Sequence, residues 1–199
     1  MTISVSPLRL VRWIAWVAVG LLTAAMLYLM MAPEARKGAV IGGPFTLTAM
    51  TGQRVNVGEA EKGKPYAVFF GFTHCPDICP TSMYELSQLL AKLGDRARDF
   101  RVYFVSVDPE RDTPKIVNDY VSSFDKRIIG LSGPRAEIDK VIKAYRVYAK
   151  KIPDAKGGED YAMDHTAIVY LMDKRGRFIG AFNMSRPPAE AAKDLAKYL

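Results

Sequence analysis

The chain has 199 residues, of which 49% are apolar and 25% are charged, and its formal net charge at neutral pH is +7. These totals exclude an intrinsically disordered chain and predict one globular domain of about 160 residues. The basic residues are scattered and form no stripe with interleaved aromatic residues, which argues against nucleic-acid binding.

An uncharged, mostly apolar run occupies residues 13–31. As a helix it would be about 28 Å long, close to the roughly 30 Å hydrocarbon core of a bilayer. The apolar region of a cleaved signal peptide is normally shorter, at about 7–15 residues. The run therefore predicts a retained transmembrane helix that anchors the chain in lipid, with a signal peptide as the alternative.

This anchor divides the chain into four predicted segments. Residues 1–12 would form a cytoplasmic N-terminus, 13–31 the anchor and 32–43 a linker, and the domain would occupy residues 44–199. Basic residues stand on both sides of the anchor, so their count alone does not predict its orientation.

Strand-like and helix-like patterns alternate along the domain. Strands are predicted at 45–50, 54–57, 66–72, 101–107, 128–131, 166–172 and 177–182. Helices are predicted at 83–93, 116–124, 138–145 and 187–199, with Lys150 and Lys151 near the end of the third helix and a loop over 153–164. This order predicts an α/β domain of the thioredoxin-like class, a mixed sheet flanked by helices and closed by an antiparallel hairpin.

The two cysteines are the strongest functional signal. Cys75 and Cys79 lie directly after the apolar strand predicted at 66–72, and each precedes a proline. Proline disfavours helical backbone in the residue before it, so the pair is expected on a loop that leads into a helix. That helix would begin at Pro80, with Cys79 as its cap, or at Ser82. In either case its dipole would favour the Cys79 thiolate, the form that binds metals and attacks disulfides.

His165 stands at the start of the strand predicted at 166–172. If that strand pairs antiparallel with 66–72, the start of one strand and the end of the other share a sheet edge, and His165 would reach the thiols. Two thiols and an imidazole form a soft ligand set that suits copper. The alternatives are an inert disulfide or buried free thiols, and a histidine with a purely structural role.

Other polar and sulfur-containing residues are weaker candidates for the site. Asp108 follows the strand at 101–107, where ligand sites of α/β sheets gather, so it could orient a ligand or a partner; a turn or cap is the alternative. His74 is at best a neighbour of the ligands, because adjacent side chains diverge, and Asp77 is foremost a turn residue. Met83 and Met163 could offer a weak thioether contact, although core packing is expected for Met83 and a loop position for Met163.

Four motifs together resemble those of the Sco/SenC family of copper chaperones. They are residues 71–80 with the two cysteines, 106–114 with Asp108, 164–166 with His165, and 173–178, and the resemblance covers about residues 38–199. It implies a thioredoxin-like domain on the outer side of the inner membrane, facing the periplasm or the intermembrane space. It also implies copper, as Cu(I) or Cu(II), bound by Cys75, Cys79 and His165.

The resemblance further implies a role in building the binuclear copper centre of cytochrome c oxidase. One hypothesis is a metallochaperone, without enzymatic activity, that takes copper from an upstream donor and delivers it to the copper-centre subunit. The other is a thiol–disulfide oxidoreductase that reduces the cysteines of that subunit and is itself reduced by a thioredoxin-like protein. Three residues separate the cysteines, where redox domains of this fold usually have two, and no proline precedes the facing strand, which favours metal binding. The glycine pair at 157–158 suggests a loop that lets His165 detach.

Overall fold

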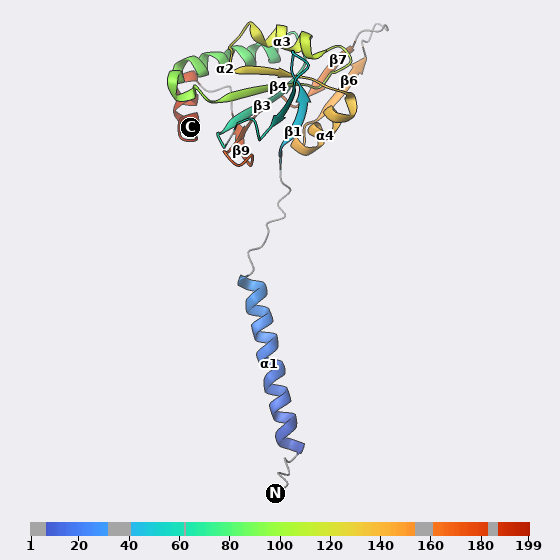
Figure 1. Cartoon of the computed structure of the whole chain (residues 1–199), viewed down its shortest axis with the longest axis vertical. Helices are drawn as coiled ribbons and strands as arrows, with labels where there is room; N and C mark the ends of the chain where they lie inside the picture. Colours follow the sequence, from blue (N-terminus) through green and yellow to red (C-terminus); the bar gives the residue numbers. More distant parts are fainter. Residues whose placement is uncertain (1–6, 32–40, 62, 154–160, 183–186) are drawn as a thin grey trace. The chain divides into compact units, whose positions relative to one another are not determined.

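The computed structural model describes the chain except residues 1–6, 32–40, 62, 154–160 and 183–186 (Figure 1). The chain divides into two compact units, Met1–Ala39 and Val40–Leu199. The first contains helix α1 (Pro7–Met31), whose side chains from Val11 to Leu27 are exposed. Among the described residues, no helix combines the length and the apolar character that crossing a membrane requires.

The second unit is built on a five-stranded sheet in the order β5-β4-β3-β8-β9. The parallel strands are β3 (Tyr66–Gly71), β4 (Arg101–Ser106) and β5 (Ile128–Leu131). β8 (Val169–Met172) runs antiparallel to β3 and forms a hairpin with β9 (Phe178–Phe182). β3 is buried along its whole length, because its side chains are apolar and strands flank it on both sides. The sheet and its antiparallel β3–β8 pair confirm the predicted mixed sheet.

Helices cover both faces of this sheet (Figure 1). Phe69 of β3 lies against Phe104, and Phe104 contacts Tyr120 of helix α3 (Pro114–Ser122). The next residue, Phe70, points to the opposite face and contacts Tyr145 of helix α4 (Arg135–Tyr145). The helical segments are α2 (Ile78–Leu93), the 3₁₀ helix η1 (Gly94–Ala97), α3 (Pro114–Ser122), α4 (Arg135–Tyr145) and α5 (Pro188–Leu195). A mixed sheet covered in this way is the predicted thioredoxin-like α/β architecture.

The last residues of the predicted linker pack against the domain. The backbone N–H of Gly42 donates to the carbonyl of Ala144 at 2.8 Å, and the Tyr145 hydroxyl donates to the carbonyl of Gly43 at 3.1 Å. Gly42 has a positive φ of 84°, and a Cβ there would lie 2.7 Å from the end of the Met172 side chain. This close approach explains a glycine at the entrance to the domain.

Two smaller sheets lie beside the main one. The predicted hairpin is present as β1 (Phe45–Thr48) and β2 (Arg54–Val57). A second pair, β6 (Ala149–Pro153) and β7 (Tyr161–His165), occupies the segment in which we expect a loop, so that prediction was wrong for its described part.

The C-terminal end of α4 directs the chain into β6. Arg146 adopts a left-handed conformation, with φ 55° and ψ 35°, which ends the helix and turns the chain into β6. Lys150 and Lys151 therefore lie in a strand. The prediction that they lie near the end of a helix was wrong. His165 is the last residue of β7 and pairs with Ala149. The glycine pair at 157–158 lies outside the described residues.

Candidate metal centre

Two thiols and one imidazole meet where the chain leaves β3 and β7. The Sγ atoms of Cys75 and Cys79 and a ring nitrogen of His165 all lie within 4.8 Å of one another. Cys79 Sγ is 3.6 Å from His165 Nε2, and the backbone N–H of Cys79 points to Cys75 Sγ at 3.4 Å. The antiparallel pairing of β3 with β8 brings them together, as predicted, because β3 ends and β8 begins at the same edge.

Helix α2 begins earlier than either predicted start. Its first residue is Ile78 and its N-cap residue is Asp77, whose carbonyl accepts from the backbone N–H of Thr81 at 3.1 Å. Pro80 is tolerated inside this turn, because the first N–H groups of a helix have no partner within it. Cys79 therefore lies in the first turn and is helical, although a proline follows it.

The two thiols have different surroundings. Cys75 is half-buried, whereas Cys79 is fully buried and its sulfur packs over Gly71, where a Cβ would lie 2.8 Å from it. Burial raises the pKa of the Cys79 thiol well above its ordinary value. The expectation that the helix dipole favours the Cys79 thiolate was therefore wrong for the metal-free protein, because the side chain turns into the core.

The imidazole of His165 presents a lone pair to the thiols. Its Nδ1 lies 3.2 Å from the carbonyl oxygen of Thr166. A carbonyl can only accept, so Nδ1 carries the proton and Nε2 faces Cys79 unprotonated. The rings of Phe69 and Phe72 stand edge-on to the imidazole, with centroids 6.5 and 5.6 Å away. Burial lowers the pKa of His165, which favours the neutral, metal-binding form.

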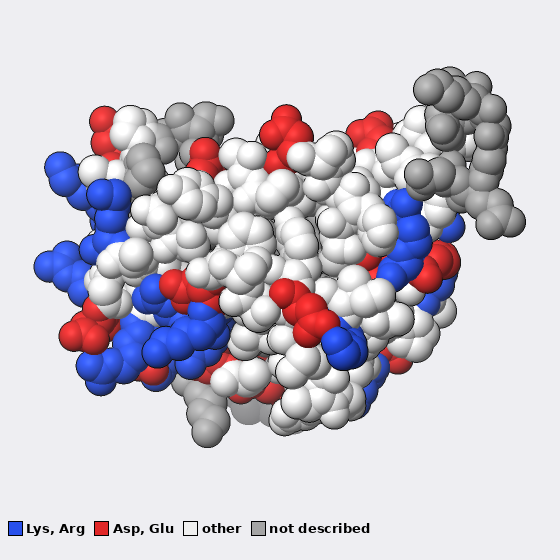
Figure 2. Space-filling model, turned by 90° about the horizontal axis from the view of Figure 1, so that it is seen from above, with Lys and Arg blue, Asp and Glu red and all other residues white. Residues whose placement is uncertain are grey.

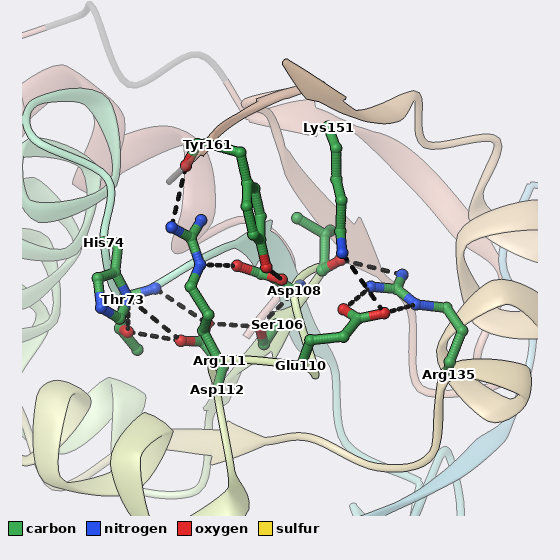
Figure 3. A network of polar contacts seen from close by, with 11 residues as sticks. Thr73, His74, Ser106, Asp108, Glu110, Arg111, Asp112, Arg135, Lys151 and Tyr161 are labelled. Carbon is green, nitrogen blue, oxygen red and sulfur yellow. Dashed lines mark hydrogen bonds and ion pairs between the residues drawn. The ribbon is translucent and has the colours of Figure 1, made fainter. Parts of the chain in front are cut away.

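The buried carboxylate of Asp112 fixes the segment before Cys75 (Figure 3). It accepts from the backbone N–H and the hydroxyl of Thr73, at 3.0 and 2.5 Å, and from the Ser106 hydroxyl at 2.6 Å. The sequence pattern does not single out Asp112, although it lies in the same motif as Asp108. His74 is 54% exposed at its side chain, with Nδ1 3.8 Å from Asp112, and does not belong to the three-ligand cluster.

Asp108 is also buried, but it faces the strand that carries His165. Its carboxylate accepts from the Tyr161 hydroxyl at 2.7 Å and from Arg111 Nε at 2.5 Å. It does not cap α3, since Thr113 does so. Its backbone carbonyl accepts from the N–H groups of Arg111 and Asp112, which makes it a turn residue as well. The sequence does not indicate the partners Arg111 and Tyr161.

The two methionine candidates are both packing residues. Met83 is fully buried in α2, as predicted. Met163 lies in β7 and is 8% exposed, so its predicted loop position was wrong.

A protein-family model described as SCO1/SenC matches residues 33–199, which is most of the chain. The chain belongs to the SCO1/SenC family. Among solved members, ScoI from Bradyrhizobium japonicum with copper bound is 55% identical and superimposes with a TM-score of 0.74, covering 80% of this chain and 99% of that one. Nearly all of that solved chain is the matching domain, so in that relative the domain folds without the segment that precedes it here.

More distant members extend the comparison. The human mitochondrial SCO1 homolog is 38% identical over 162 residues, which is 80% of this chain and 53% of that protein. BsSco, described as a member of the Sco family of cytochrome c oxidase assembly proteins with a disulfide switch, is 25% identical with a TM-score of 0.62, over 80% of this chain and 93% of that one. This chain spans about half the length of its human and yeast relatives.

Proposed function

We propose that this SCO1/SenC protein binds copper through Cys75, Cys79 and His165. The observation that carries the proposal is the meeting of three soft donor atoms within 4.8 Å. Two thiolates suit Cu(I), and the imidazole extends the site to Cu(II). The copper-bound structure of the B. japonicum relative supports the choice of metal.

The site suits the transfer of copper better than its permanent storage. Three donors leave copper open to a further ligand, and the half-buried Cys75 gives an incoming partner access to one side of the metal. We propose that copper reaches this site from an upstream donor and passes to the copper-centre subunit of cytochrome c oxidase. The description of BsSco as an oxidase assembly protein supports this destination.

A second candidate function is the reduction of cysteines in that same subunit. The two thiols are free and adjacent, and BsSco is described as having a disulfide switch. A dithiol in this position can reduce a disulfide and become oxidised itself, after which a thioredoxin-like protein would restore it. The two functions are compatible, because copper binding also requires both thiols to be reduced.

We further propose that the uncharged run 13–31 anchors the protein as a single span in the inner membrane, with the domain in the periplasm or intermembrane space. The uncharged run 13–31 and the mitochondrial names of several relatives support this location. In membranes from expressing cells, the full chain should resist carbonate extraction, and the domain should be digested by protease added from the outer side. Release by carbonate would contradict the anchor.

Metal analysis of the unit Val40–Leu199, purified reduced and without air, tests the copper site. We expect bound copper in the unchanged unit and in His74→Ala, which is the matched control. Cys75→Ser and Cys79→Ser should lose copper in both valences. His165→Ala should lose Cu(II) but keep thiol–disulfide exchange with a model disulfide. Equal Cu(II) binding by the unchanged unit and His165→Ala would contradict the three-ligand site.

A further inference from the structure

The candidate site is assembled from two separate parts of the domain. The thiols belong to the segment that leaves β3 and enters the first turn of α2, which packs into the main core. His165 ends β7, which pairs with β6 in a two-stranded sheet apart from the five-stranded one. The position of the imidazole therefore depends on what holds this small sheet against the domain.

Arg111 and Tyr161 form a polar contact between the main part of the domain and the small sheet (Figure 3). The guanidinium carbon of Arg111 lies 3.7 Å from the centre of the Tyr161 ring, and Nη1 donates to the Tyr161 carbonyl at 2.9 Å. Asp108 joins them, because it accepts from both Arg111 Nε and the Tyr161 hydroxyl. We call these three residues the Arg111 clasp. It holds Tyr161 by its ring, its hydroxyl and its backbone.

The clasp reaches the imidazole along two routes. In β7, Tyr161, Met163 and His165 are less exposed than the residues between them, so all three face the domain. Fixing Tyr161 at the start of the strand therefore fixes the face on which His165 lies at its end. The second route runs through Phe72, whose ring centre is 6.0 Å from the guanidinium of Arg111 and 5.6 Å from the imidazole.

A second set of contacts, made by Lys151 of β6, also supports the β6–β7 sheet. Figure 3 shows the Tyr161 ring between Arg111 and Lys151, and Lys151 Nζ lies 4.5 Å from the ring centre. Lys151 also lies 3.8 Å from Glu110, which Arg135 binds. The side chains of Lys151 and Glu110 are 45% and 43% exposed, whereas that of Arg111 is 19% exposed. Exposed ion pairs contribute little to stability. Arg111 therefore contributes more than Lys151 to holding the small sheet against the domain.

We propose that Arg111 is a positioning residue that holds His165 over the thiols and thereby sets how strongly the site binds Cu(II) relative to Cu(I). This inference rests on the proposed copper site. Two thiolates can hold Cu(I) by themselves, whereas Cu(II) depends on the imidazole nitrogen. Loosening the clasp therefore weakens Cu(II) binding and leaves Cu(I) binding nearly unchanged.

The variant Arg111→Lys tests this proposal in the unit Val40–Leu199. Lysine keeps a positive charge opposite Asp108 but loses the planar group that stacks on the ring and donates to two partners. We expect the affinity for Cu(II) to fall about tenfold or more, and the affinity for Cu(I) to fall less than about threefold. Competition with chelators of each valence under nitrogen measures both, and the sulfur-to-copper absorption of the Cu(II) form should shift.

Arg127→Lys is the matched control. Arg127 binds Asp125 through Nε and Nη2, at 2.8 and 2.6 Å, and its side chain is 15% exposed. It precedes β5, and so lies at the start of the parallel strands, whereas the thiols lie beyond their ends. We expect both copper affinities to be unchanged in this variant. Amide exchange at Tyr161–His165 in the metal-free unit should accelerate in Arg111→Lys and not in Arg127→Lys.

Tyr161→Phe provides a second, milder variant, which decides the question if Arg111→Lys does not fold. It keeps the stacked ring and loses the hydrogen bond to Asp108, so Cu(II) affinity should fall about threefold. Equal losses for the two valences, or unchanged Cu(II) affinity in the folded variants, would overturn the positioning role. Failure of the copper site itself is recognised separately, because His165→Ala would then bind Cu(II) as the unchanged unit does.

Discussion

Replacing Gly71 with alanine tests how tightly the Cys79 sulfur is seated. A Cβ at this position would lie 2.8 Å from Cys79 Sγ and 2.9 Å from ring carbons of both Phe69 and Phe104. Favourable contacts need about 3.5–4.0 Å, so these neighbours would have to move by about 0.6–1.2 Å. All three are fully buried, which prevents easy relaxation. We expect urea titration of the metal-free domain to show a free energy of unfolding lower by about 1–3 kcal/mol, as for other overpacked cores.

The same displacement should weaken copper binding, since it moves one of the proposed ligands. Misplaced surroundings of a ligand typically cost about 10- to 100-fold in metal affinity. Gly180→Ala in β9 is the matched control, because no atom of the described residues beyond its chain neighbours lies within 4 Å of a Cβ there. If Gly71→Ala matches Gly180→Ala in both stability and copper affinity, the tight seat inferred for the sulfur is wrong.

Asp112→Asn should lower the free energy of unfolding by about 2–3 kcal/mol. The amide NH₂ would face the N–H and hydroxyl groups of Thr73 and Ser106, which now donate hydrogen bonds to the buried carboxylate. The control Asp119→Asn, at an exposed ion pair, should cost at most about 1 kcal/mol in the same urea titration, and equal costs would contradict the anchoring role of Asp112. Burial raises the pKa of Cys79, so copper must displace its proton, and apparent affinity should rise by about one log unit or more per pH unit near neutrality. Because burial lowers the pKa of His165, protonation of the imidazole should steepen this dependence only below about pH 6.5; a pH-independent affinity would refute both points. Finally, Cys79→Ser, which leaves the half-buried Cys75, should react with iodoacetamide faster than Cys75→Ser, and equal rates would contradict the difference in burial.

The main sheet and the three-ligand cluster could be predicted because their signals are local or topological. The apolar run of β3 indicates a strand buried on both faces, and its antiparallel pairing with β8 places His165 near the thiols. This pairing brings residues that are far apart in the chain to the same edge of the sheet. A pattern of apolar residues is therefore sufficient to predict that part of the site.

The small sheet that carries His165 could not be predicted in the same way. β6 is largely exposed, and its Ala-Lys-Lys-Ile-Pro sequence lacks the alternation of a half-buried strand. The clasp has no sequence signal either, because Arg111 and Tyr161 meet only through the tertiary fold. The early start of α2 depends on a helical cysteine before proline, which local preference disfavours.

The pairing of β3 with β8 also sets when the complete ligand set can exist during synthesis. Cys79 leaves the ribosome 86 residues before His165, and β8 follows the histidine. A nascent chain therefore presents a bare dithiol while these 86 residues are added, and the imidazole can join it only after the sheet has nearly closed. Copper that requires all three donors must enter a finished domain.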